Sequence, residues 1–280
     1  MIHQPTSLAQ AISLRADHPE ALLLGGGTDV MVEINFGHRQ VTDVIALRSV
    51  PELREWSQQD GVLRIGAGIP YAQLETGPIA ALLPALAQAA RTVGSPQIRA
   101  AGTIGGNLGT CSPAGDSLPV LFAHDATVVV AHAGGERRIP FSEFMTGPKR
   151  NSLSPNEIIL AVEINVPSGF QAYSKVGVRN AMVISIASAC LVHDTNSRTV
   201  RLAMGTVGPT ILRARRAEEW LAAQCDLSRT PLVTPEMAAE FGNLCAQECT
   251  PITDHRSTAE YRRHAIGVVS SRLLERCAAQ

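Results

Sequence analysis

The sequence predicts an α+β protein with a larger N-terminal region and a smaller C-terminal one. Patterns typical of strands, turns and short helices alternate along residues 1–70, and three strand patterns followed by three helical patterns occupy the chain after residue 170. The 280 residues are 45% hydrophobic and 18% charged, which is typical of a globular protein with a substantial core.

Hydrophobic periodicity, together with glycine and proline punctuation, predicts the elements of the first region. In chain order we first expect a helix over 8–16 capped by Thr6, a strand at 21–25, a short helix over 30–35 and strands at 41–47 and 62–68. We then expect one helix over 78–93, a short helix over 118–124 and a strand at 126–132 that turns at Gly134 and Gly135 into a hairpin. An irregular connection over 145–156 and a strand at 157–167 complete the region. Pro167, Ser168 and Gly169 then interrupt the pattern and mark the best boundary.

The second region follows this boundary and groups its strands before its helices. We expect strands near 172–178, 183–192 and 199–207, then helices near 213–223, 235–249 and 257–277. This order indicates an α+β layer domain.

Charge and apolar patterning limit the partners and the location. The formal net charge of -1 gives no general attraction to nucleic acid or to an anionic membrane. No apolar run approaches the roughly 18 to 20 residues that span a bilayer, and the N-terminal residues do not resemble a signal peptide. We therefore expect a cytoplasmic protein without membrane insertion and without a nucleic-acid partner.

The six cysteines are scattered along the chain, and Cys245 and Cys249 are the only close pair. This density is below that of a disulfide scaffold, so we expect reduced thiols. Metal sites normally need about four ligands, so we interpret the pair as small buried side chains and predict no metal-ligand set.

Two glycine-rich loops carry the strongest functional signal. The first, "GGGTD" at residues 25–29, follows an apolar strand, and its glycines can direct successive backbone N–H groups at one point. The second, "GTIGGN" at residues 102–107, repeats the pattern, and Asp116 beyond it is suited to accept hydrogen bonds from sugar hydroxyls. Together they predict a site for a pyrophosphate ligand that bears hydroxyl groups.

The competing interpretation is that these glycines only reverse the chain, as isolated glycine patterns often do. The dinucleotide fingerprint GxGxxG is absent, because "GAGIPY" at 66–71 ends in Tyr71 instead of glycine. No GxxxxGK[ST] motif occurs, which excludes a P-loop ATPase.

Four motifs in order along the chain carry a resemblance to a known family. "LLGGGTDVMV", "GSPQIRAAGTIGGNLGTCSPAGDSLP", "EIILAVEI" and "YSKVGVRNAMVISIA" resemble the FAD-binding subunit of molybdenum hydroxylases, the xanthine dehydrogenase and carbon monoxide dehydrogenase family. The resemblance implies an FAD-binding domain of the vanillyl-alcohol oxidase type over 1–169, in two α+β subdomains divided near 55–60. It also implies a C-terminal flavoprotein domain over 170–280, with an antiparallel sheet plus helices.

The same resemblance places the FAD contacts by position. They fall on Leu23, Leu24, Gly25, Gly26, Gly27, Thr28, Asp29, Val30, Thr103, Ile104, Gly105, Gly106, Asn107, Thr110, Ser112, Asp116, Ile159 and Lys175. Val93 stands where the eukaryotic xanthine dehydrogenase pattern has an aromatic residue near the flavin, so it offers no such stacking. From composition alone Lys175 would be an exposed charge, whereas beside a flavin it could stabilise negative charge on the reduced ring.

The function that this resemblance implies is electron transfer through FAD, with no catalytic residue of the chain's own. Electrons would arrive from iron–sulfur clusters on a small partner subunit, which takes them from a molybdopterin centre on a large one, and would leave to NAD+ or another acceptor. The family also suggests a dimer of heterotrimers. Two alternatives are a stand-alone flavin oxidase of the same fold and a non-catalytic nucleotide-binding assembly subunit.

Overall fold

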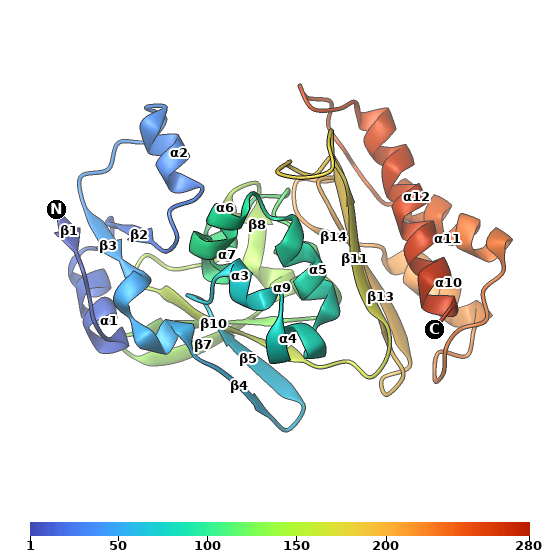
Figure 1. Ribbon diagram of the computed structural model, residues 1–280, viewed down its shortest axis with the longest axis horizontal. Coiled ribbons are helices and arrows are strands. Elements are labelled where there is room, and N and C mark those ends of the chain that lie inside the picture. The colour runs from blue at the N-terminus through green and yellow to red at the C-terminus, as the bar shows by residue number, and fades with distance from the viewer.

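The computed structural model describes all 280 residues. The chain begins with a small parallel sheet. The strands β1 (Ile2–His3), β3 (Val44–Ala46) and β2 (Leu22–Leu24) pair in this order. Helix α1 (Leu8–Asp17) is capped by Ser7, whose side chain accepts from the N–H of Gln10, so the cap is one residue later than the predicted Thr6. Helix α2 (Val30–Asn35) projects above the sheet (Figure 1).

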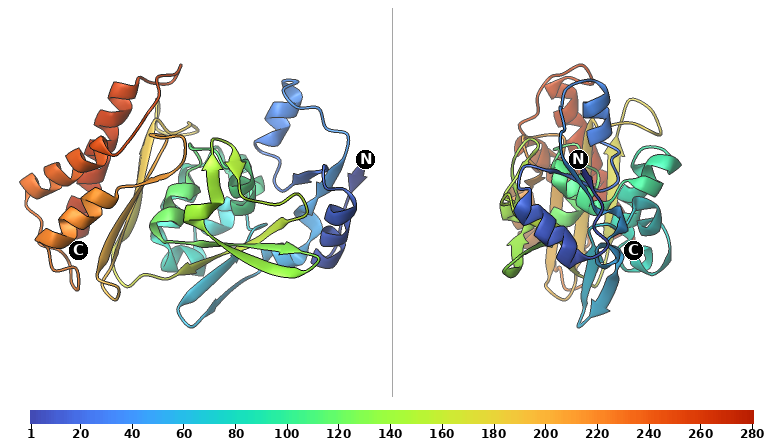
Figure 2. Two further views of the ribbon diagram at one scale, coloured as in Figure 1. Left: turned by 180° about the vertical axis from the view of Figure 1, so that it is seen from behind. Right: turned by 90° about the vertical axis from the view of Figure 1, so that its left-hand side faces the viewer.

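A five-stranded antiparallel sheet follows, in the order β4-β5-β10-β6-β7. Its strands are β4 (Trp56–Gln59), β5 (Val62–Gly66), β10 (Ile158–Asn165), β6 (Thr127–His132) and β7 (Gly135–Pro140). The central strand β10 is almost wholly buried, as its apolar run "IILAVEI" requires. Turning the molecule shows this sheet in front of the helices that pack on it (Figure 2).

Short helices connect these strands and cover one face of the sheet (Figure 1). They are η1 (Leu47–Ser49), η2 (Pro51–Arg54), α3 (Tyr71–Leu74), α4 (Gly77–Leu82), α5 (Pro84–Thr92), α6 (Pro96–Ala101), α7 (Ile104–Thr110), α8 (Ser117–Ala123) and α9 (Phe141–Phe144).

Several elements differ from the sequence-based expectation, which lacked α6, α7 and β4, and residues 104–107 of the second glycine loop form the first turn of α7. The helix predicted over 78–93 is two helices, α4 and α5. Pro84 lacks an N–H and disfavours helical geometry at Leu83, whose φ of -127° and ψ of 67° end the first helix. The connection at 145–156 contains a small hairpin of β8 (Met145–Gly147) and β9 (Arg150–Asn151).

The C-terminal part is an antiparallel sheet with three helices on its outer face (Figure 1). The strands are β11 (Gln171–Val176), β12 (Ala187–Asp194), β13 (Thr199–Gly205) and β14 (Leu212–Arg213), and the helices are α10 (Arg215–Gln224), α11 (Pro235–Gln247) and α12 (Ala259–Ala278). The predicted α+β class, with a C-terminal antiparallel sheet plus helices, is confirmed.

This sheet is buried on both faces, and alternate residues of β12 enter two different cores. Cys190 and Val192 join the larger core of 42 residues in the N-terminal part. Ala189 and Leu191 join a core of 21 residues against α10, α11 and α12. The sheet is therefore fixed against α5 and α8. No helix of the protein is both long and apolar enough to cross a membrane.

Candidate functional site

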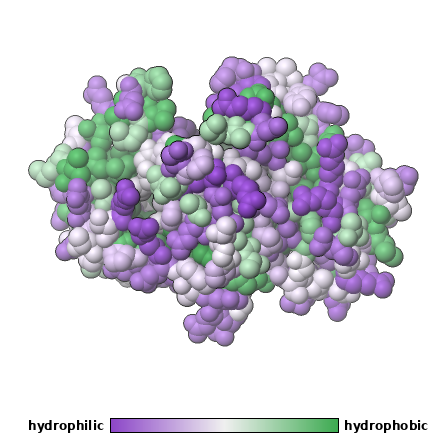
Figure 3. Space-filling model, viewed as in Figure 1, coloured by the Kyte–Doolittle hydropathy of each residue, from purple (hydrophilic) through white to green (hydrophobic).

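A cleft of about 860 Å³ opens between the N-terminal sheet, the helices α6 and α7, and the loop before β12. Figure 3 shows the hollow between the lobe that carries α2 and the rest of the molecule. Its volume is within the range of roughly 300–1,000 Å³ that is typical of small-molecule and cofactor sites. Of the residues predicted as contacts, all but Leu24, Ile104 and Lys175 line this cleft.

The two glycine loops lie directly against each other and form one wall of the cleft. A Cβ atom built on Gly26 would lie 1.9 Å from the carbonyl oxygen of Ala101, at the start of the second loop. A Cβ on Gly102 would lie 3.1 Å from the Thr28 hydroxyl. The close approach at Gly26 requires glycine there, because no side chain fits between the two backbones.

The first loop offers a run of unused donors. None of the backbone N–H groups of residues 25–29 donates to another backbone group. Gly27 has a φ of +73°, a left-handed conformation that bends the run of amides. Successive unpaired amides of this kind form an anion-binding concavity, since they provide partial positive charge at a fixed place.

The second loop is different, because its amides are already paired. The N–H of Gly105 donates to the carbonyl of Ala67 at 2.8 Å, and the N–H of Gly106 donates to the hydroxyl of Thr103 at 2.9 Å. Free amides in series are thus found in the first loop only, against the expectation that both loops offer them. The glycine at 105 serves close packing instead, because a Cβ there would lie 2.5 Å from the Cβ of Ala67.

A buried hydrogen-bond chain orients Asn107 at the second loop. The Ser117 hydroxyl donates to Asn107 Oδ1 at 2.7 Å, and the Tyr71 hydroxyl lies 3.1 Å from that of Ser117. Burial raises the pKa of Tyr71 far above its usual value, so the phenol keeps its proton. Because the amide oxygen is used, Asn107 is left with its NH2 group to donate.

Asp116 is bound by three side chains of the C-terminal part. Its Oδ1 accepts from the hydroxyls of Tyr173 and Ser185, both at 2.7 Å, and its Oδ2 accepts from Lys175 Nζ at 2.8 Å. Burial, then the charge of Asp116, raises the pKa of Tyr173 well above its usual value, so this phenol remains a donor. The network ties the start of α8 to β11 and to the loop before β12.

Lys175 lies outside the cleft lining and is neither exposed nor free. Its side chain is 8% exposed, and its ammonium also donates to the carbonyls of Thr92 at 3.1 Å and Val183 at 3.2 Å. With Asp116, these acceptors use all three of its protons. Any influence of Lys175 on a ligand is therefore exerted through Asp116 and through the loop that contains Val183.

The remaining predicted residues have distinct positions. Asp29 is exposed, and its Oδ2 accepts from the Thr110 hydroxyl at 3.3 Å, so it joins the first loop to α7. Ile159 and Val93 add apolar surface to the lining. Ile104 is fully buried in the larger core, which explains why it does not reach the cleft.

Sequence reasoning missed the basic residues of the cleft, and two exposed ones have no acidic partner. Arg48 in η1 and Arg54 in η2 line it, are exposed, and form no ion pair. The place of Arg48, two residues after β3, was an available signal, because loops that follow regular elements commonly carry binding residues. Two unpaired guanidinium groups add positive charge to the same cleft as the free amides.

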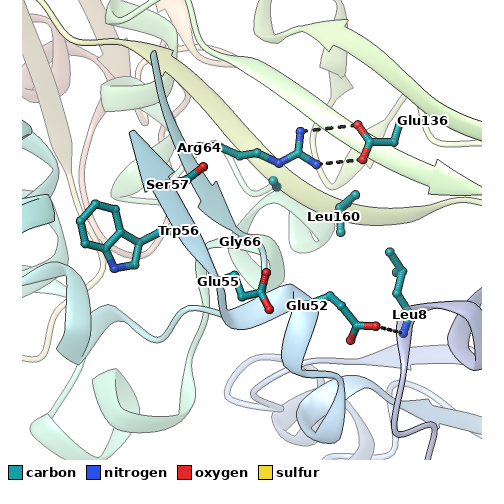
Figure 4. Close-up of a pocket in the computed structure, with 10 residues that line it drawn as sticks. Leu8, Glu52, Glu55, Trp56, Ser57, Arg64, Gly66, Glu136 and Leu160 are labelled. Carbon is teal, nitrogen blue, oxygen red and sulfur yellow. Dashed lines mark hydrogen bonds and ion pairs between the residues drawn. The ribbon is translucent and has the colours of Figure 1, made fainter. Parts of the chain in front are cut away.

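A second cavity of about 260 Å³ lies between the start of α1 and the sheet (Figure 4). Most of its charged groups are paired: Arg64 pairs with Glu136 at 3.0 Å, and Glu52 accepts from the N–H of Leu8 at 3.0 Å, whereas Glu55 forms no ion pair. Neither glycine loop reaches it. We therefore take the larger cleft as the candidate site.

Two family models match the chain. The one described as "FAD binding domain in molybdopterin dehydrogenase" matches residues 1–167, and the one described as "CO dehydrogenase flavoprotein C-terminal domain" matches residues 171–277.

Relatives and solved structures agree with these matches. The chain is 33% identical over 288 residues to the xanthine dehydrogenase FAD-binding subunit of Escherichia coli O157:H7, covering 99% of this chain and 95% of that protein. It is 34% identical over 229 residues to the nicotinate dehydrogenase FAD-subunit of Eubacterium barkeri, covering 78% and 77%. The structure resembles a chain of carbon monoxide dehydrogenase from Hydrogenophaga pseudoflava with a TM-score of 0.90 and 28% identity, covering 99% and 96%.

Proposed function

The chain belongs to the FAD-binding subunits of the molybdenum hydroxylase family, and from this premise we propose that it carries electrons between a molybdenum-containing partner and a soluble acceptor. It is a subunit of an FAD-dependent oxidoreductase. The observation that carries the site assignment is the run of unused amides at residues 25–29, packed against the second glycine loop inside a cleft of about 860 Å³.

Each part of the cleft has a proposed task in holding the cofactor. Bound FAD supplies a ring system that takes up and releases electrons. The amides of residues 25–29 bind its diphosphate, and the Asn107 NH2 group donates a further hydrogen bond. Ile159 and Val93 provide apolar contacts that exclude water. We propose that the other predicted contacts that line the cleft also touch the bound cofactor.

Asp116 is proposed to bind a ligand hydroxyl with the acceptor capacity that remains to it. A carboxylate offers about four acceptor positions, and the protein uses three of them. The same three bonds hold the carboxylate in one orientation, so the remaining position has a fixed direction. Lys175 is proposed as the residue that holds this carboxylate in place through their ion pair at 2.8 Å.

The partners and the acceptor extend this proposal. We place the molybdopterin on a large partner subunit and the iron–sulfur clusters on a small one, and we expect a cytoplasmic dimer of heterotrimers. NAD+ is the proposed acceptor. We also propose that the chain has an FAD-binding domain over 1–169, divided near 55–60, and a C-terminal domain over 170–280.

Anaerobic addition of NADH to the FAD-loaded chain tests the proposed acceptor, because hydride transfer is reversible. Loss of the oxidised flavin absorbance is expected. An unchanged spectrum in a chain that retains FAD would point to another acceptor. A chain that oxidises a substrate without partners would be a stand-alone oxidase, and one that binds no flavin would be an assembly subunit.

A further inference from the structure

Three side chains from separate segments meet beside β1, the edge strand of the parallel sheet, which Figure 1 shows next to the N-terminus. His3 lies in β1, His18 is the C-terminal cap of α1, and Asp43 precedes β3. His3 Nε2 lies 2.9 Å from Asp43 Oδ1, and His18 Nδ1 lies 2.9 Å from Asp43 Oδ2. The two imidazole rings lie with their centroids 4.4 Å apart.

The arrangement has the donors and the spacing of a metal site. One nitrogen of each histidine and one carboxylate oxygen all lie within 4.8 Å of one another. Ligands bound tetrahedrally at about 2.0–2.1 Å from zinc lie roughly 3.3 Å apart, so small side-chain rotations suffice to bring all three onto one ion. Two imidazoles and a carboxylate form a donor set that zinc binds with one position left for water.

Solvent access and charge allow an ion to reach this group. The side chains of His3, His18 and Asp43 are 13%, 38% and 25% exposed. Burial alone would raise the pKa of Asp43, but the charge and hydrogen bond of His3 and the charge of His18 lower it, so the carboxylate is ionised. The amino group of Met1, 3.7 Å from Asp43 Oδ1, is the other charge at this place and competes with a cation.

We propose that His3, His18 and Asp43 bind a divalent transition-metal ion of the zinc type. The ion takes the place between each imidazole nitrogen and the carboxylate, and each neutral imidazole carries its one proton on the ring nitrogen that faces away from the ion. It links β1 and the end of α1 to β3, the strand that pairs with β2. Since β2 runs directly into the first glycine loop, the ion fixes the strand that carries the loop. This proposal does not depend on the function proposed above.

Calorimetric titration of the purified full chain with zinc chloride, with or without FAD, tests the site. The protein carries a C-terminal tag without histidine, which leaves Met1 unchanged, and is treated with a chelator beforehand. We expect one ion per chain with a dissociation constant of roughly 10 μM or below, because three ligands bind more weakly than the complete four-ligand sites. H18Q is expected to weaken binding about tenfold or more, since two ligands remain.

H255Q is the matched control, because His255 is an exposed histidine outside this group. It is expected to bind zinc as the unmodified chain does. H3Q gives a second measurement, and the cobalt absorption spectrum of the unmodified chain gives a third that needs no variant. Zinc binding weaker than about 1 mM, or unchanged affinity in H18Q, would overturn the proposal. Equal loss in H255Q would do so as well.

Discussion

Replacing Gly26 by alanine is predicted to separate the two glycine loops and to weaken FAD binding. The new Cβ would lie 1.9 Å from the Ala101 carbonyl oxygen, 2.5 Å from its carbon and 2.9 Å from the Gly102 Cα. All three are backbone atoms, so no side-chain rotation relieves the contact. The loops must move apart by roughly 1 Å or more to restore ordinary contact distances, and overpacking of this kind costs about 1–3 kcal/mol.

If this cost falls on the FAD-bound state, the dissociation constant for FAD rises about 5- to 150-fold. Titration of the apoprotein with FAD, followed by quenching of flavin fluorescence, measures it. Gly134→Ala is the control, because Gly134 lies outside the cleft and a Cβ there meets only the side chain of His132. An unchanged dissociation constant in Gly26→Ala, with the fold intact by circular dichroism, would refute the assignment of this wall to the cofactor.

Three further predictions concern buried and paired groups. Lys175→Met leaves the Asp116 carboxylate without its cation and is expected to lower the free energy of unfolding in urea by about 3–5 kcal/mol. A loss below about 1 kcal/mol would contradict a buried ion pair at this place. Burial raises the pKa of Asp254, but hydrogen bonds from backbone amides and Arg262 outweigh it and lower the pKa to about 2. Stability is therefore lost as pH falls from about 4 to 2, and Asp254→Asn is expected to flatten this part of the plot of unfolding free energy against pH. An unchanged slope in the variant would contradict this prediction. Burial raises the pKa of Cys111 to about 11, so iodoacetamide at about pH 8 is expected to label only the less buried Cys225. Mass spectrometry identifies the labelled residues, and modification of Cys111 in the folded protein would contradict its buried position.

Features set by neighbours in the chain could be predicted from the sequence. The strand before residue 25 and the glycines after it are a local pattern, and β2 with its loop follows from it. Helix α2 over Val30–Asn35 occupies the predicted residues. The break at Leu83 and Pro84 was also visible in the sequence, but the apolar periodicity on both sides of it favoured one helix.

Features set by distant partners could not be predicted in this way. The bond of Asp116 to Lys175 joins residues 59 positions apart, and the bond to Ser185 joins residues 69 apart. The pairing of the second loop's amides depends on how Ala67 packs against Gly105. The group of His3, His18 and Asp43 likewise forms only when three segments come together. The prediction of no metal ligands considered the spacing of the cysteines, which gives no sign of this group.

The central claim is that the cleft beside the two glycine loops holds FAD. The most direct test is to incubate the purified chain with FAD, remove the unbound cofactor by gel filtration and record the visible spectrum. The account predicts one tightly retained FAD per chain, released when the protein is denatured. A colourless protein after this treatment, with its fold intact, would contradict it.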